Sequence, residues 1–337
     1  GGKSKRKAVL LWHGLLDDAY TWVEQGKGRA LAYLLADQGY DVWMGNNRGN
    51  CYCQEHTYLS PKSEEFWNFS WDEMAKYDLQ DTIKYIQRKK TPPSETPAKI
   101  AYIGHSEGTT QMFAGLSENP KFFEQSLSCF VALGPVARVG NIDSRALKAL
   151  ALFRMDYICW VIGLRKSFMP RGSMLEQQFL GIFSYMFPSV VEVILTLLCG
   201  KPNTPMATND IINWGQHEPG GSSIVNIAHW CQMIRSDGFR KCNYGSKRNL
   251  LRYGTKDAPS YDLSRVPRSL NKLLIRGTND ALVGKTDFDW LCAQVGVTDP
   301  VELEGWNHTD YLWDPNAHVT LYPRVIKYVN SINAPAH

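Results

Sequence analysis

Short apolar runs alternate with helical patterns in the first part of the chain. Residues Ala8 to Trp12 are continuously apolar and are followed by a loop-like His-Gly pair, which is typical of a buried parallel strand. Residues Arg29 to Gln38 carry apolar side chains at helical spacing and stop at Gly39, after which Tyr40 to Met44 has the pattern of a second strand. Strand, helix and strand in this order predict a parallel sheet.

The same alternation continues to residue 133. Trp71 to Lys89 has the pattern of a long amphipathic helix, and the proline-rich residues 91–97 end it. Next come a predicted strand at Ile100 to Ile103, a helix at Glu107 to Leu116 and a strand at Ser128 to Leu133.

The alternation stops in the middle of the chain and resumes near the carboxyl end. Residues 137–261 are rich in large apolar side chains and helical runs, with proline and glycine between them. We therefore predict a core at 1–137, an inserted helical cap at 138–261 and the rest of the core at 262–337. The resumed pattern predicts these last elements: a strand at Lys272 to Arg276, a helix at Lys285 to Val295, a strand at Pro300 to Glu304 and a helix at Val319 to Ile332.

Composition argues against a nucleic-acid partner and against a membrane-spanning segment. The 337 residues are 44% hydrophobic and 21% charged, with a formal net charge of only +4 and scattered basic residues, so we expect no nucleic-acid partner. No run reaches the roughly 18 apolar residues of a membrane span, because charges interrupt Ala146 to Leu164 and because Val190 to Leu198 is too short.

The eight cysteines give no metal-binding spacing. Cys51 and Cys53 are the only close pair, and a metal site there would need two more ligands nearby. We expect ordinary packing or a disulfide elsewhere, with no metal and no cofactor.

Ser106 stands between Gly104 and Gly108, where a predicted strand must turn into a predicted helix. This arrangement is typical of a nucleophile elbow, which holds a serine on a tight turn above a sheet. The alternative is a simple turn residue.

An acid and a histidine follow Ser106 in the order that α/β hydrolases use. Asp280 and His308 each come just after a predicted strand, so both should lie at the sheet edge that carries Ser106. A serine hydroxyl needs such a base, and the base needs a carboxylate. Alternatives stay open: Asp280 as a helix cap with Asp287 or Asp289 as the acid, and His308 as a surface residue.

Two backbone N–H groups are candidates for an oxyanion hole. One belongs to Glu107, directly after the serine, and the other to Leu15, in the loop after the first strand. The alternative for Leu15 is that it belongs to a tight apolar turn with no role in catalysis. His13 and His105 are expected to be structural.

Longer motifs carry a resemblance to a known family. They are the loop His13 to Leu16, residues 39–50, residues 66–78, the elbow with Thr109 and Thr110, the run Asn307 to Asp310, and in the cap residues 221–223, Asn226 and residues 229–232. The chain resembles the acid lipase family from about Ala8 to its end. Gastric lipase, lysosomal acid lipase and fungal steryl ester hydrolases are members.

The resemblance implies an α/β-hydrolase fold and a function. It implies Ser106 as nucleophile, Asp280 as acid, His308 as base and the N–H groups of Leu15 and Glu107 as the oxyanion hole. The implied reaction is hydrolysis of long-chain fatty acid esters, either triacylglycerols or steryl esters, at a lipid–water interface. An acyltransferase on the same triad and a silent binding module are the alternatives, and the oligomeric state stays open.

The cap would supply the acyl-binding tunnel or lid. Its candidate residues, some of which could instead be ordinary packing residues, are Phe168, Met169, Phe179, Phe183, Tyr185, Met186 and Phe187. The resemblance implies a secreted or lysosomal location, with a lipid droplet or membrane surface as the alternative.

Three departures from the family qualify the comparison. Glu107 replaces the usual glutamine, and the chain starts near the third strand of the family, as a fragment or an unusual member would. Cys199 matches one cysteine of a family disulfide but has no partner close before it. Two glycosylation sequons occur, at Asn68 and Asn307, and we expect the second to be incidental because it adjoins His308.

Overall fold

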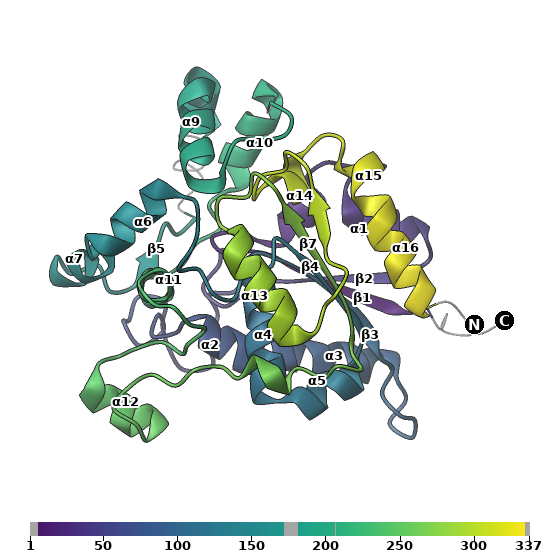
Figure 1. The fold of residues 1–337 in the computed structure, drawn as a ribbon, viewed down its shortest axis with the longest axis horizontal. Coiled ribbons are helices and arrows are strands. Elements are labelled where there is room, and N and C mark those ends of the chain that lie inside the picture. Colours follow the sequence, from purple (N-terminus) through teal and green to yellow (C-terminus); the bar gives the residue numbers. More distant parts are fainter. Residues whose placement is uncertain (1–5, 172–180, 206, 334–337) are drawn as a thin grey trace.

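Six parallel strands form the central sheet of the computed structural model, which describes residues 6–171, 181–205 and 207–333 (Figure 1). In spatial order they are β2 (Asp41–Gly45), β1 (Ala8–Trp12), β3 (Ile100–His105), β4 (Leu127–Leu133), β7 (Asn271–Gly277) and β8 (Val301–Leu303). Every neighbouring pair is parallel, which confirms the predicted fold class.

Helices cover both faces of this sheet. Leu10 and Trp12 of β1 contribute to the apolar core on one face, while Val9 and Leu11 contribute to the core on the other. The first face is covered by α2 (Trp71–Glu73), a π-helix (Met74–Asp78), α3 (Leu79–Lys90), α4 (Glu107–Glu118), α5 (Pro120–Ser126) and α13 (Lys285–Val295). The second is covered by α1 (Leu31–Asp37), α14 (Asp310–Trp313), α15 (Ala317–Thr320) and α16 (Tyr322–Asn333).

Burial on both faces explains why the strands read as apolar runs without alternation. All five residues of β1 and all six of β3 are buried. A strand covered on both sides has no solvent-facing positions at which polar residues would be favoured. The continuous apolar pattern of Ala8 to Trp12 was therefore the correct signal for a central strand.

The helices differ in detail from the sequence prediction. The helix predicted at Trp71 to Lys89 contains a π-helical segment. The closing helix predicted at Val319 to Ile332 is divided into α15 and α16, and Pro323 lies in the first turn of α16, where its missing N–H is tolerated. The short helix α5, which begins at Pro120, was not predicted.

The chain between β4 and β7 is mostly helical in its described parts. Its helices are α6 (Arg145–Leu152), α7 (Met155–Val161), residues 181–186, α9 (Pro188–Cys199), α10 (Thr208–His217), α11 (Ile224–Ile234) and α12 (Ser246–Tyr253). Two-residue strands, β5 (Ser167–Phe168) and β6 (Ser222–Ser223), pair with each other. Figure 1 shows α6, α7, α9 and α10 grouped on one side of the sheet. The limits 138–261 for a separate cap domain stay a prediction.

The strand order defines where a site can form. The chain leaves β1 toward β2 on one side and leaves β3 toward β4 on the other, so the direction of winding changes between β1 and β3. In open parallel sheets, ligands bind beyond the carboxyl ends of the strands at such a point. The loop after β1 and the turn after β3 carry Leu15 and Ser106.

Candidate active site

Ser106 lies on a sharp turn between β3 and α4. Its backbone has φ 51° and ψ −119°, a conformation that non-glycine residues rarely adopt. The flanking glycines are required by close approach, because a Cβ on Gly108 would lie 2.6 Å from the carbonyl oxygen of Trp12, and a Cβ on Gly104 would lie 3.1 Å from the backbone carbon of Gly108. The strained turn explains why a serine stands between two glycines.

The structure brings together the three residues predicted to act as a unit. His308 Nε2 lies 2.7 Å from Ser106 Oγ, and His308 Nδ1 lies 2.9 Å from both carboxylate oxygens of Asp280. His308 and Asp280 are buried, whereas Ser106 is partly accessible. This hydrogen-bonded chain can draw a proton from the serine hydroxyl onto the imidazole.

Three donors besides His308 hold the Asp280 carboxylate in its ionised form. The backbone N–H groups of Leu282 and Val283 donate to Oδ1 at 2.9 and 3.0 Å, and the Tyr311 hydroxyl donates to Oδ2 at 3.0 Å. Burial alone would raise the pKa of Asp280, but His308 and these hydrogen bonds hold that pKa below its ordinary value. Asp280 therefore stays charged and can stabilise an imidazolium on His308.

Tyr311 was not identified from the sequence. Its oxygen accepts a hydrogen bond from the Gly277 N–H at 2.6 Å, which leaves its own proton for Asp280. A tyrosine three residues after the histidine carries no distinctive signal by itself, because only the fold places it against the acid.

The rival acids lie elsewhere. Asp287 is buried but accepts hydrogen bonds from Arg138 Nε at 2.5 Å and from the Asn141 backbone at 2.8 Å. Asp289 is exposed and pairs with Lys285. Each therefore has a structural partner of its own, which leaves Asp280 as the carboxylate at His308.

The two other histidines near the elbow have structural environments. His13 Nδ1 donates to the Gly14 carbonyl at 2.8 Å, while its Nε2 accepts from the Asn47 N–H at 3.1 Å. His105 Nε2 lies 2.9 Å from the His308 carbonyl oxygen. Burial lowers the pKa of His13 to about 4 and that of His105 to about 3, so both rings are neutral at ordinary pH.

The loop after β1 lies directly against the serine. A Cβ on Gly14 would be 3.1 Å from Ser106 Cβ and 3.6 Å from Ser106 Oγ, so the backbone of this loop passes close to the serine. The neighbouring Leu15 thus lies beside the nucleophile. Glu107 begins α4, where the first N–H groups have no partner within the helix. Both N–H groups thus lie on the two turns that meet at the serine, the arrangement that an oxyanion hole requires.

The side chain of Glu107 is buried in a polar network. Its carboxylate accepts hydrogen bonds from Trp230 Nε1 at 2.6 Å, from Asn226 Nδ2 at 2.8 Å and from Gln111 Nε2 at 3.3 Å. Burial raises the pKa of this carboxyl, and the three hydrogen bonds partly offset that effect. The side chain connects α4 to α11 of the helical insertion, a structural role that sequence reasoning did not find.

We expect Glu107→Gln to leave ester hydrolysis near neutral pH within about a few-fold of wild type, because the amide oxygen can replace one carboxylate oxygen and the backbone N–H is unchanged. Glu107→Leu should instead destabilise the fold by about 1–3 kcal/mol for each buried donor left without an acceptor. Rates and thermal melts of both variants test this. A large loss of activity in Glu107→Gln with an unchanged melt would show that the carboxylate takes part in the chemistry.

The end of α9 contacts both loops that carry the acid and the base. The carbonyl of Cys199 accepts hydrogen bonds from the backbone N–H groups of Ala281 and His308, each at 3.2 Å. Asn307 donates to the Gly200 carbonyl at 2.9 Å and is buried, so its sequon is sequestered, whereas Asn68 is exposed. The eight cysteines all lie in the described part of the chain and the structure joins none of them in a disulfide, so it contradicts the sequence alternative of a disulfide among them.

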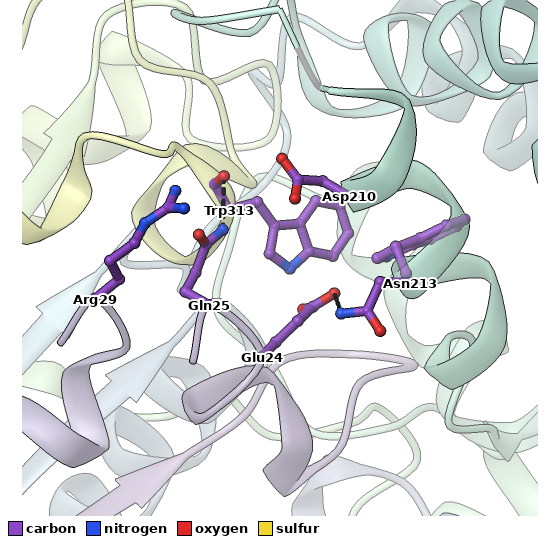
Figure 2. A pocket seen from close by; sticks show the side chains of 7 residues that line it. Glu24, Gln25, Arg29, Asp210, Asn213 and Trp313 are labelled. Atoms are coloured by element: carbon purple, nitrogen blue, oxygen red, sulfur yellow. Dashed lines mark hydrogen bonds between the residues drawn. The ribbon is translucent and has the colours of Figure 1, made fainter. Parts of the chain in front are cut away.

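Residues of the core and of the insertion line a small cavity that Ser106 does not line (Figure 2). Its volume is about 70 Å³, and its lining residues are Glu24, Gln25, Arg29, Asp210, Asn213, Trp214 and Trp313. Asn213 of α10 points toward Glu24 and donates to its carboxylate at 3.5 Å (Figure 2). Burial, with added repulsion from Asp17, Asp210 and Asp18, raises the pKa of Glu24 from its ordinary 4.5 to about 8.

This junction makes stability depend on pH. Between about pH 4.5 and pH 8, Glu24 holds its proton in the folded protein but releases it in the unfolded chain. The contribution of this group to the free energy of unfolding is therefore complete below pH 4.5 and is lost as the pH rises through 8. The slope is up to about 1.4 kcal/mol per pH unit.

Thermal melts across this pH range should therefore show a smaller fall in melting temperature for Glu24→Gln than for wild type. The exposed Glu95→Gln serves as the control and should follow wild type. An equal fall in all three proteins would show that Glu24 does not cause the dependence.

Comparisons with known proteins agree with this geometry. A family model described as alpha/beta hydrolase fold matches residues 7–155. The chain is 36% identical to the gastric triacylglycerol lipase of Rattus norvegicus over 330 residues, which are 96% of this chain and 80% of that protein. It is 33% identical to the lysosomal acid lipase/cholesteryl ester hydrolase of Homo sapiens, over 96% of this chain and 79% of the relative.

A nematode protein and a solved structure extend the comparison. Lipase lipl-1 of Caenorhabditis elegans is 33% identical over 97% of this chain and 81% of its own length. A soluble variant of the monoglyceride lipase of Saccharomyces cerevisiae superposes with a TM-score of 0.56 at 11% identity, over 99% of this chain and 89% of that one. This second likeness concerns the fold alone.

Proposed function

Because the chain belongs to the α/β-hydrolase family of the gastric and lysosomal acid lipases, we propose that it is a serine hydrolase of long-chain fatty acid esters, with triacylglycerols or steryl esters as substrates. Ser106 is the nucleophile, His308 the general base and Asp280 the acid that orients it. The observation that carries the proposal is the hydrogen-bonded chain from Ser106 through His308 to Asp280, placed on a strained turn beside the loop after β1.

The reaction follows from the geometry in two halves. Ser106 Oγ attacks the ester carbonyl while His308 Nε2 takes its proton, and the oxyanion accepts hydrogen bonds from the N–H groups of Leu15 and Glu107. Collapse expels the alcohol, which receives the proton from His308, and leaves an acyl-enzyme on Ser106. Water then attacks the acyl carbon while His308 Nε2 takes its proton, and that proton passes to Ser106 Oγ as the fatty acid leaves.

The helical insertion presents the apolar surface that an insoluble substrate requires. Exposed large apolar side chains lie along α6, α7, residues 181–187 and α9; they include Leu152, Phe153, Tyr157, Val161, Ile162, Ile182, Val190, Val193 and Leu197. Exposed apolar side chains gathered on neighbouring helices mark an interaction surface on a folded protein. In this proposal the face binds the lipid–water interface.

The predicted acyl-binding residues divide between this surface and the packed interior. Met169, Tyr185, Met186 and Phe187 are exposed. Phe183 is partly buried and packs against the cluster of Val191, Leu195 and Ile211, and Phe168 is also partly buried. Phe179 lies outside the described residues. The exposed members are available to contact an acyl chain or a lipid surface.

The proposal is tested in two steps. A fluorophosphonate probe should label wild-type protein at Ser106, as found by peptide mass spectrometry, because only an activated serine reacts with it. Emulsions of triolein and of cholesteryl oleate, assayed across pH, should then release fatty acid. No labelling and no release from either emulsion would overturn the proposal, and the ratio of the two rates identifies the preferred substrate class.

We place the protein in the secretory route or the lysosomal lumen, on the basis of its gastric and lysosomal relatives and the exposed sequon at Asn68. The names of these relatives give no support to the lipid-droplet or membrane-surface alternative. No helix in the described ranges is long and apolar enough to cross a membrane. A mobility shift after glycosidase treatment of protein from eukaryotic cells, abolished in Asn68→Gln, tests this placement.

A further inference from the structure

The helix α12 presents two adjacent leucines to solvent. The side chains of Leu250 and Leu251 are 52% and 84% exposed, and no large apolar side chain in the described ranges is more exposed than Leu251. Figure 1 shows α12 protruding from the body of the molecule, apart from α6, α7 and α9. The two leucines are therefore separate from the apolar surface of those helices.

The protrusion is built by specific hydrogen bonds. Asn249 is fully buried within it, and its amide nitrogen donates to Asn243 Oδ1 at 2.8 Å and to the Lys256 carbonyl at 2.9 Å. The Tyr244 N–H donates to Asn249 Oδ1 at 2.9 Å, and Gly254 ends the helix in the left-handed conformation, with φ 75°. This framework holds the leucines outward, since the buried side of the helix is used for its internal polar contacts.

The segment around α12 is strongly basic. Residues 240–256 contain six Lys or Arg residues and no Asp or Glu, although the whole chain has a net charge of only +4. Lys241 pairs with Glu118 and Arg252 pairs with Glu73. The other four cations, Arg240, Lys247, Arg248 and Lys256, are exposed and have no ion pair within the described part of the chain.

Exposed leucines flanked by unpaired cations suit one kind of partner. Apolar side chains enter the interfacial region of a bilayer while Lys and Arg attract anionic head groups. A nucleic acid or an acidic protein surface would account for the charge but would leave the two leucines without a favourable environment. The combination therefore favours an anionic lipid surface.

We propose that α12 with its flanking residues 240–256 is a docking surface for anionic lipid membranes, distinct from the substrate-facing surface of the other helices. The inference rests on the proposed function, because a lipid surface is where a lipase would find its substrate. Docking through α12 adds an electrostatic contact that depends on the lipid head groups, so it selects which surface the enzyme approaches rather than which ester it cleaves.

Sedimentation with vesicles tests the proposal without requiring catalysis. The full chain is mixed with vesicles of phosphatidylcholine alone or with about one third phosphatidylglycerol. We expect Lys247→Ala/Arg248→Ala to lower partitioning onto the anionic vesicles about tenfold and onto neutral vesicles little, because each cation near an anionic surface contributes several-fold. Leu250→Ser/Leu251→Ser should lower partitioning onto anionic vesicles at unchanged charge.

A matched control separates α12 from overall charge. Lys99→Ala/Lys121→Ala removes the same charge from exposed positions elsewhere and should bind as wild type. The proposal is overturned if this control loses as much binding as the α12 charge variant. It is also overturned if the leucine variant binds the vesicles as wild type does, because the patch would then suit a charged macromolecule rather than a lipid surface.

Hydrolysis of a monomeric short-chain ester keeps the two proposals distinguishable. All of these variants should hydrolyse such an ester at the wild-type rate, since none touches the site at Ser106. Loss of vesicle binding with normal ester hydrolysis supports the docking surface. Absence of hydrolysis in wild type with vesicle binding that depends on α12 would count against the proposed function alone.

Discussion

Replacing Ser106 or His308 by alanine is expected to lower ester hydrolysis by on the order of 10⁴-fold or more, with the fold retained. The 2.7 Å contact between Ser106 Oγ and His308 Nε2 makes the two side chains one proton-transfer unit, so removal of either one disables the same step. Residual activity would come from binding and from the oxyanion hole alone.

Matched variants separate this effect from general damage to the fold. Ser128→Ala on β4 and His56→Ala on the surface should retain wild-type rates, because neither side chain belongs to the hydrogen-bonded chain at the elbow. Steady-state kinetics and thermal melts of all four proteins are the measurements. Normal turnover in Ser106→Ala or in His308→Ala, with correctly folded protein, would refute the mechanism.

The second large effect is expected from Asp280→Asn, which should lower turnover by roughly 10³- to 10⁴-fold. An amide retains an oxygen for the two backbone donors Leu282 and Val283, so the loop should keep its shape, and its NH₂ group replaces the oxygen that accepts from Tyr311. Its NH₂ group would then face His308 Nδ1, which favours the wrong imidazole tautomer and removes the charge that stabilises the imidazolium.

Asp287→Asn is the matched control, because it alters another buried carboxylate. Asp287 accepts hydrogen bonds from Arg138 and Asn141, so its substitution should lower the melting temperature while turnover per folded molecule stays near wild type. Turnover and melts measured on the same preparations compare the two. The opposite pattern, with turnover lost in Asp287→Asn and retained in Asp280→Asn, would show that Asp280 is not the acid of the triad.

Much of the sheet could be predicted because its signals are local. The runs at β1 and β3 are apolar throughout, since both faces of a central parallel strand are buried. Helix limits are not encoded in the same way. The π-helical segment Met74–Asp78 and the break between α15 and α16 depend on how these helices pack, and the amphipathic pattern is nearly the same with or without them.

The sequence by itself determined the elements that meet at the site. Gly104, Ser106 and Gly108 are neighbours in the chain, and parallel strands bring the loops of Asp280 and His308 to the same sheet edge, so order and spacing were sufficient to select them. The local pattern of glycines around Ser106 selects the turn, and the rule that parallel strands end at one sheet edge selects the other two loops.

Only the tertiary structure decided what surrounds these residues. The Glu107 carboxylate meets Asn226 and Trp230, which are 119 and 123 residues away in the chain. The Tyr311 hydroxyl reaches Asp280 because α14 packs beside β7, and Glu24 is partly buried because residues of α10 lie against it. The physical reason is that burial and hydrogen-bond partners depend on how distant elements pack, and no pattern within one element encodes which side chain will lie opposite.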